Sequence, residues 1–265
     1  MKRRFPVEFV YQVFALIIVI IVVHAIYVTY VRPTAFAVLE AQEISMAQDP
    51  FYIPERSLVV LIRDFEQQAC FILMFWAFAI MGFKAVTTLR ERALLDRDLV
   101  NVPEGLRILP EDTREYARNL QGLPERQRQL FLPRVLLASL ERFGSSRNVQ
   151  DVASAARDAC DSEAERMESE LSMIRYIAWA IPSVGFIGTV RGIGEALAQA
   201  HLAVEGDISG VTQSLGVAFN STFIALLISI VVMFLVHQLQ LLQERLVFDA
   251  QTYVDHNLVR HMKAA

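Results

Sequence analysis

Four stretches of the chain are long and apolar enough to cross a membrane as helices. Residues 10–31 contain no acidic side chain, lysine or arginine, and the other three stretches are residues 67–89, 174–200 and 213–238. A membrane-spanning helix needs about 20 largely apolar residues. The second stretch reaches that length if Lys84 extends its ammonium group to the interface. The pattern therefore predicts four transmembrane helices.

The basic residues indicate how these helices are oriented. Of the 25 lysines and arginines, 21 fall in residues 1–9, in the stretch 84–175 or in residues 239–265. Lysine and arginine accumulate on the cytoplasmic side of a membrane. We therefore expect both termini and a large insertion, residues 90–173, in the cytoplasm, with residues 32–66 and 201–212 on the opposite side of the membrane.

The first stretch also has features of a secretory signal peptide. The basic start, Met1–Arg4, precedes an apolar region, and Ala35, Phe36 and Ala37 form a small-x-small sequence. The apolar region is longer than the 7–15 residues typical of signal peptides, and Pro33 intervenes. An uncleaved anchor is favoured, and cleavage would leave three spans in the same orientation.

The cytoplasmic insertion is predicted to be helical throughout. Pro124 suits the first position of a helix, Gly144 suits the left-handed residue after a helix end, and Asn148 suits an N-cap. From there a charged helix is expected to run into the third span, and a leucine stripe extends the fourth span beyond the membrane. The predicted fold is an all-α membrane protein, with spans 3 and 4 extended into the cytoplasm as long helices.

Composition excludes several classes of protein. Apolar residues make up 54% of the chain, charged residues 20%, and the mean hydropathy is +0.36. These values exclude a disordered chain, and two cysteines are too few for a disulfide framework. A net charge of −4 gives no basic surface for nucleic acid, and neither metal-ligand spacing nor a nucleotide-binding loop is present. We expect no cofactor. The acidic stretch 161–170 suits a solvated helix face, or contact with a cytoplasmic partner.

Spans 3 and 4 each carry one face of small residues. At about 100° per residue, the face of span 3 contains Pro182, Gly185, Gly188, Thr189, Gly192 and Ala196. The face of span 4 contains Ser214, Ala218, Ser221, Thr222, Ala225 and Ser229. Small faces allow membrane helices to pack closely, so packing between the two spans explains most of this pattern.

The hydroxyl groups on these faces add a second interpretation. Thr189, Thr222 and Ser221 lie at mid-membrane depth, where they could line a narrow wet path for protons, although a threonine can also bond back to its own helix. No aspartate or glutamate lies in the middle of any span, and Glu195 is expected to pair with Arg191 near the outer mouth. A proton path normally needs a titratable group at mid-depth. If protons move here, another chain has to supply the carboxylate.

Spans 3 and 4 each contain a recognisable motif. Residues 182–192 read PSVGFIGTVRG, and residues 215–227 read LGVAFNSTFIALL. The first is similar to the P-x-x-G-x-x-G-T-V-x-G run of the MotA/TolQ/ExbB proton-channel family of inner-membrane energisers, and the second is similar to that family's last-helix pattern around a threonine. The four spans resemble the motor-stator branch, whereas the Gly-Thr-Val motif is closer to the TolQ/ExbB branch.

The resemblance implies a homopentamer around single-span partner chains of MotB, TolR or ExbD type, which supply a mid-membrane aspartate. It also implies that the chain lies in the bacterial inner membrane, with residues 32–66 and 201–212 in the periplasm. Thr189 and Thr222 match the family's pore-facing threonines. Proton flow would then drive rotation and power outer-membrane transport, envelope constriction, motility or phage defence. The chain departs from the family pattern at Arg191, Glu195 and Gln213, and Asn220 projects away from the small face.

Three hypotheses follow from the sequence. The first is a proton-channel subunit that is not an enzyme. The second is a membrane scaffold or signalling protein that uses the small faces for packing alone. The third, an intramembrane serine hydrolase, needs a Ser/His pair at depth, but His201 and His237 lie at span ends.

Overall fold

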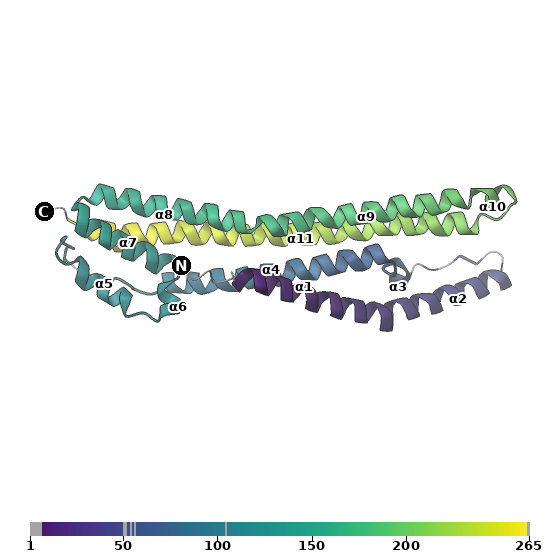
Figure 1. Cartoon of the computed structure of the whole chain (residues 1–265), viewed down its shortest axis with the longest axis horizontal. Coiled ribbons are helices and arrows are strands. Elements are labelled where there is room, and N and C mark those ends of the chain that lie inside the picture. Colours follow the sequence, from purple (N-terminus) through teal and green to yellow (C-terminus); the bar gives the residue numbers. More distant parts are fainter. Residues whose placement is uncertain (1–6, 50–51, 54, 56, 104, 264–265) are drawn as a thin grey trace. The chain divides into compact units, whose positions relative to one another are not determined.

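The computed structural model describes residues 7–49, 52–53, 55, 57–103 and 105–263. The predicted basic N-terminus, Lys2 to Arg4, lies outside these residues. The described residues form helices and no β-strand, which confirms the all-α prediction. Figure 1 shows the helices, and the chain divides into two compact units. Unit 1 comprises Met1–Met81 and Met173–Val236, and unit 2 comprises Gly82–Ser172 and His237–Ala265.

Unit 1 begins with a helix that continues past the end of the first predicted span. It comprises α1 (Val7–Ile26), a π-helical turn η1 (Tyr27–Val31) and α2 (Arg32–Gln48). Pro33 lacks an N–H for the usual bond four residues back, and the Arg32 N–H bonds to the Tyr27 carbonyl, five residues back. The helix therefore adjusts to the proline by widening one turn rather than by ending, and Ala35–Ala37 lies inside α2.

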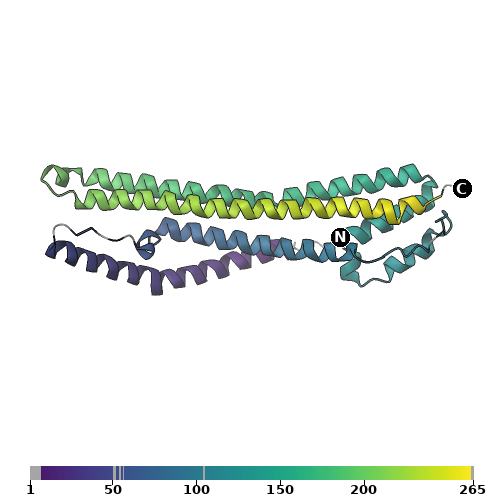
Figure 2. The ribbon, with the colours of Figure 1, turned by 180° about the vertical axis from the view of Figure 1, so that it is seen from behind.

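The rest of unit 1 is made of helices that pack lengthwise. A short helix α3 (Leu58–Leu61) precedes α4 (Phe65–Leu95), whose residues up to Met81 belong to this unit. The helices α9 (Ser172–Ala198) and α11 (Ser209–Asn257) are joined through α10 (Ala200–Val204) and run side by side (Figures 1 and 2). Gly206, with φ of +101°, makes the left-handed turn that this connection requires.

The outer surface of unit 1 is strongly apolar. Large side chains such as Ile21, Phe186 and Ile230 are each more than 60% exposed. The described residues contain four helices that are long and apolar enough to cross a membrane. Contiguous apolar surface on this scale is incompatible with exposure to water, so the chain is a membrane protein.

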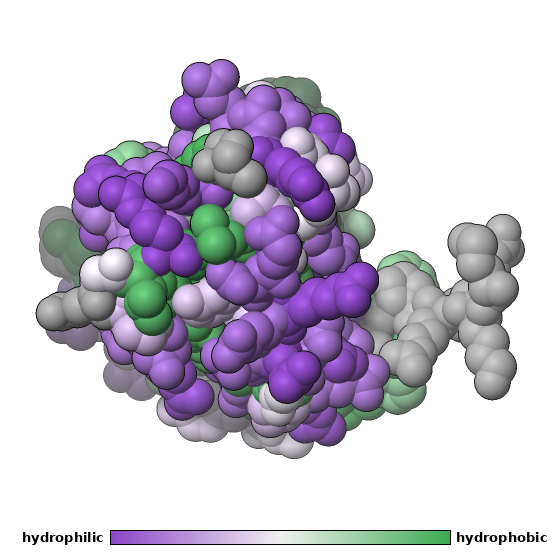
Figure 3. Space-filling view, turned by 90° about the vertical axis from the view of Figure 1, so that its left-hand side faces the viewer, coloured by the Kyte–Doolittle hydropathy of each residue, from purple (hydrophilic) through white to green (hydrophobic). Residues whose placement is uncertain are grey.

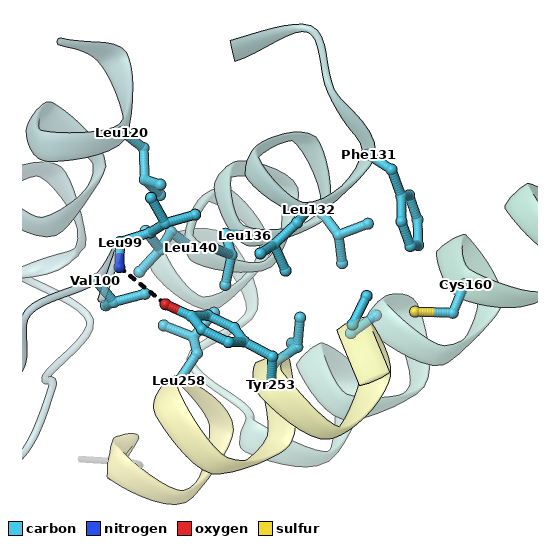
Figure 4. Packing of buried hydrophobic residues seen from close by; sticks show 14 of the residues in the cluster. Leu99, Val100, Leu120, Phe131, Leu132, Leu136, Leu140, Cys160, Tyr253 and Leu258 are labelled. Atoms are coloured by element: carbon cyan, nitrogen blue, oxygen red, sulfur yellow. Dashed lines mark hydrogen bonds between the residues drawn. The ribbon is translucent and has the colours of Figure 1, made fainter. Parts of the chain in front are cut away.

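Unit 2 has a conventional hydrophobic core (Figure 4). It is built from α5 (Thr113–Gln121), α6 (Glu125–Arg128), α7 (Phe131–Ser146), α8 (Val149–Glu170) and the 3-10 turn η2 (Val259–His261), together with the ends of α4 and α11. Phe131, Leu136, Leu140 and Phe143 are almost fully buried. The Tyr253 hydroxyl accepts a hydrogen bond from the Leu99 N–H at 2.8 Å and donates one to the Arg97 carbonyl at 2.8 Å. The core thus ties α11 to the segment after α4.

The helix ends in unit 2 agree only partly with the sequence predictions. Asn148 is the N-cap of α8, as predicted, and its side chain accepts a hydrogen bond from the Gln150 N–H at 2.9 Å. The prediction that Gly144 ends a helix is wrong, because it lies inside α7 and Arg147 takes the left-handed position, with φ of 53°. Gly144 is needed for packing instead: a Cβ there would lie 2.9 Å from the Thr113 hydroxyl oxygen.

The two long helices predicted to leave the membrane are present. Only Leu171 separates α8 from α9, and the stripe that follows span 4 on α11 buries Leu239, Leu246 and Tyr253. The end face of unit 2 is covered mainly by hydrophilic side chains (Figure 3).

Lys84 does not extend towards solvent as the sequence suggested. Its side chain is 3% exposed, and its Nζ atom lies 2.9 Å from the Glu170 carboxylate. Glu170 also faces Arg166, which pairs with the buried Glu163, and Glu163 in turn pairs with Arg134. A buried ammonium group requires a compensating charge, which Glu170 supplies to Lys84. Together these ion pairs join α4, α7 and α8 within unit 2.

Candidate functional site

The small faces of α9 and α11 interlock in unit 1. A Cβ at Gly188 would lie 2.6 Å from the Ser221 Cβ, and one at Gly192 would lie 2.8 Å from both the Ala218 Cβ and its backbone nitrogen. A Cβ at Gly185 would collide with the Ala225 side chain. Only glycine fits at these three positions. The residues predicted to form the packing faces are therefore brought together by direct contact between the helices.

Thr189 and Thr222 face each other across this contact, and their hydroxyl groups are hydrogen-bonded. The Thr189 hydroxyl also lies 3.0 Å from the Ala218 carbonyl and 3.3 Å from the Gly185 carbonyl. The Thr222 hydroxyl lies 3.2 Å from the same Gly185 carbonyl. Each hydroxyl has one proton to donate, so the pair has more acceptors within reach than protons to give them. It can exchange hydrogen-bond partners by rotation of the hydroxyl alone.

Pro182 is accommodated inside α9 by the neighbouring helix. A proline has no N–H, so the carbonyl four residues earlier, that of Ala178, loses its bond within the helix. The Ser229 hydroxyl of α11 donates to this carbonyl at 3.3 Å. In a membrane, such a carbonyl needs a partner from the protein. Pro182 and Ser229 therefore form a matched pair that joins the two helices.

Arg191 and Glu195 are joined by an ion pair of 2.7 Å on α9. A stronger partner of Arg191 comes from the start of α4. Glu66 accepts two hydrogen bonds from the guanidinium group, at 2.7 and 2.9 Å. A two-pronged arginine–carboxylate contact fixes both position and orientation, so it holds α4 against α9.

Glu66 and its neighbour Gln67 are functional candidates that the sequence analysis missed. The predicted boundaries assign Glu66 to the periplasmic segment, but its Cγ atom lies 3.0 Å from the position of a Cβ at Gly188, well inside span 3. Gln67 is fully buried, and its Nε2 atom lies 3.3 Å from the Ser221 hydroxyl oxygen. The feature of the sequence that points to them is the polar run Glu66-Gln67-Gln68, which lies at the start of the second predicted span.

The other polar residues considered in the sequence lie outside the small faces. His24 lies 3.0 Å from the Gln68 side chain, and the Ser183 hydroxyl bonds back to the Trp179 carbonyl of its own helix. Gln213 is exposed beside a cavity of about 550 Å³, and Asn220 is half-buried. Across the described residues, no group of three His, Cys, Asp or Glu side chains is placed to hold a metal ion.

Comparison with known proteins identifies the region that contains this site. Residues 127–252 match the family model described as the MotA/TolQ/ExbB proton channel family. This match includes α7, α8, α9 and most of α11, and it confirms the resemblance seen in the motifs. No curated protein and no solved structure matches the chain.

Proposed function

We propose that the chain, whose residues 127–252 match the MotA/TolQ/ExbB proton channel family, is the pore-forming subunit of a proton-driven complex in the bacterial inner membrane. The observation that carries the proposal is the Thr189–Thr222 hydroxyl pair, set in the glycine-lined contact between α9 and α11. Proton flow through the complex would power mechanical work or transport across the cell envelope.

The threonine pair can hand on hydrogen bonds without holding a charge. A hydroxyl group both donates and accepts, and the shared Gly185 carbonyl gives each threonine an alternative acceptor. The titratable group has to come from elsewhere, because no acidic residue belongs to either small face. Glu66, whose side chain lies close to Gly188, is already bound by Arg191. These contacts support a single-span partner of MotB, TolR or ExbD type that supplies an aspartate.

The proposed assembly is a homopentamer around that partner. Many large apolar side chains of unit 1 are exposed, which supports contact with further copies of the chain and with lipid. The proposed topology keeps both termini and unit 2 in the cytoplasm. It is supported by the concentration of lysine and arginine in residues 84–175 and by the hydrophilic end face of unit 2 (Figure 3).

A reconstitution with the partner tests this function. The chain is placed in liposomes with and without the neighbouring single-span protein, and proton flux is measured under an imposed pH gradient. We expect flux only with the partner, and loss of flux when the partner's aspartate is replaced by asparagine. Flux that is indifferent to the partner would contradict the proposal.

A membrane scaffold is the second candidate function. It is favoured by one observation: the hydrogen bonds described above for Thr189 and Thr222 all stay within the α9–α11 hairpin. A scaffold predicts a stable assembly that needs no partner carboxylate and that shows no flux in the same liposomes. The reconstitution therefore separates the two candidates.

A further inference from the structure

Three consecutive polar residues at the start of α4 contact three different parts of unit 1. Glu66 binds Arg191 on α9, Gln67 lies against Ser221 on α11, and Gln68 accepts a hydrogen bond of 2.6 Å from Arg32 on α2. Successive residues of a helix point about 100° apart, so one turn of α4 can reach all three. We call these residues the α4 polar triplet.

Gln67 is the member of the triplet that lies deepest. Its exposed fraction is 0%, and its Nε2 atom can donate to the Ser221 hydroxyl or to the Leu61 carbonyl, each at 3.3 Å. Among the described residues, none donates a hydrogen bond to its buried Oε1 atom. A buried acceptor left unpaired is destabilising, and native structures contain few of them. The position therefore favours binding of a donor from outside the described part of the chain.

Ser221 connects Gln67 to the threonine pair. The Ser221 hydroxyl oxygen lies 2.6 Å from where a Cβ at Gly188 would stand, and Ser221 directly precedes Thr222 on α11. The Ser221 hydroxyl donates to the Val217 carbonyl at 2.9 Å, which leaves its oxygen free to accept. Gly188 and Ser221, which lie against each other, thus directly precede Thr189 and Thr222 on their helices.

The flanking residues hold Gln67 in this position. The Glu66–Arg191 contact fixes α4 against α9, and the bond from Arg32 to Gln68 fixes it against the N-terminal helix. The Arg32 guanidinium also lies 4.2 Å from the centre of the Phe65 ring, which adds a cation–π contact at the first residue of α4. A glutamine anchored on both sides loses little further side-chain entropy when it binds a donor.

We propose that Gln67 is a further residue of the proton pathway, and that its Oε1 atom holds a proton-carrying water molecule next to Ser221. This inference rests on the proposed function and deepens it. The pathway then includes α4 as well as the two helices with small faces. Glu66 and Gln68 are positioning residues that act through Gln67.

The test is a flux measurement on the complex of the full chain with its partner, normalised to the amount of assembled complex. Gln67→Leu keeps the size of the side chain and removes both polar groups. We expect its flux to fall about tenfold, since each 1.4 kcal/mol in a binding step is a factor of ten. Gln67→Glu keeps an acceptor oxygen and should retain at least about a third of wild-type flux, on the scale of one hydrogen bond.

The matched control is Gln199→Leu. Gln199 makes the same kind of contact, from its Nε2 atom to the Ser214 hydroxyl at 3.3 Å, between the end of α9 and the start of α11. We expect it to keep flux within about twofold of wild type.

The possible outcomes separate the role of Gln67 from the proposed function of the chain. Gln67→Leu at wild-type flux overturns the inference, and so does Gln67→Glu at the reduced level expected of Gln67→Leu. If Gln67→Leu fails to assemble, Gln67→Glu decides alone. A wild-type complex without flux refutes the proposed function itself. Wild-type flux that is lost in Thr189→Val/Thr222→Val but kept in Gln67→Leu refutes this inference and leaves the function standing.

Discussion

The helix α11 packs in two different ways along its length. In unit 1 its contacts with α9 are made by small residues, Ala218, Ser221 and Ala225, which lie against glycines. In unit 2 the same helix buries large side chains, among them Leu246 and Tyr253, in a core that includes Phe131 and Phe143 (Figure 4). One continuous helix therefore follows two packing rules.

The difference reflects the solvent around each unit. Lipid gives apolar side chains no reason to associate, so helices in a membrane are held by close backbone approach and by hydrogen bonds. In water, burial of large apolar side chains supplies the driving force. Unit 1 accordingly exposes many large apolar residues and brings small and polar ones together between α9 and α11, whereas the core of unit 2 is built mainly from large apolar side chains. The effect of a substitution on stability should therefore depend on whether its position packs through large apolar residues or through small ones.

The largest effect is expected in the core of unit 2. Phe143→Ala removes a fully buried ring and should lower the free energy of unfolding by about 3–5 kcal/mol. The measurement is denaturant unfolding of the purified chain in detergent. Phe248→Ala is the matched control, because Phe248 lies in the same unit but is 69% exposed. A similar loss in both variants would contradict a large-residue core.

A smaller loss of stability is expected in unit 1, where it should result from adding a methyl group rather than from removing a side chain. Gly192→Ala places a Cβ 2.8 Å from the Ala218 nitrogen and the Ser214 carbonyl, which cannot move without shifting the helix. Overpacking of this kind costs about 1–3 kcal/mol. Thermal unfolding in detergent, together with yield of the assembled complex, measures the loss.

Gly194→Ala provides the control two residues away on α9. A Cβ there meets nothing within 4 Å, so the change should be neutral or should stabilise the helix by up to about 1 kcal/mol. Equal behaviour of the two variants would show that the glycine contact does not hold unit 1 together.

The smallest effect concerns a buried charge in unit 2. Glu91 lies two residues beyond the second predicted span, accepts a hydrogen bond of 3.3 Å from the Phe131 N–H, and is 7% exposed. Burial, followed by the nearby negative charge of Glu163, raises the pKa of Glu91 above its usual 4.5. The protonated form is thus favoured in the folded state.

The raised pKa of Glu91 makes the stability of the fold depend on pH. A group with a raised folded pKa stabilises the fold below its unfolded pKa, and this contribution is lost as pH rises through the folded pKa. Glu91→Gln should therefore match wild type at a pH below the pKa of an unfolded glutamate and become more stable than wild type as the pH rises above it, by about 1.4 kcal/mol for each unit of pKa difference. Unfolding midpoints measured from pH 4 to pH 8 test this. A difference that shrinks as pH rises would contradict it.

The features that follow from local rules could be predicted from the sequence. The small faces, the cap at Asn148 and the leucine stripe that follows span 4 each depend on residues close together in the chain. Periodicity and capping chemistry reveal such patterns directly.

The features that were missed depend on contacts between distant segments. The partner of Lys84 is 86 residues away, and that of Glu66 is 125 residues away. The local sequence of Gly144 predicts a helix end, because it does not show the packing of Gly144 against Thr113. The helix that continues through Pro33 was missed for a different reason, since one wide turn absorbs the proline.

The most direct test of the central claim is proton flux through the reconstituted complex when both threonines are replaced by valine. Thr189→Val/Thr222→Val preserves shape and removes only the two hydroxyl groups, and Ser183→Ala removes a hydroxyl from the same span that bonds to its own helix. The account predicts loss of flux in the double variant, with normal assembly, and wild-type flux in Ser183→Ala. Wild-type flux in the double variant would contradict it.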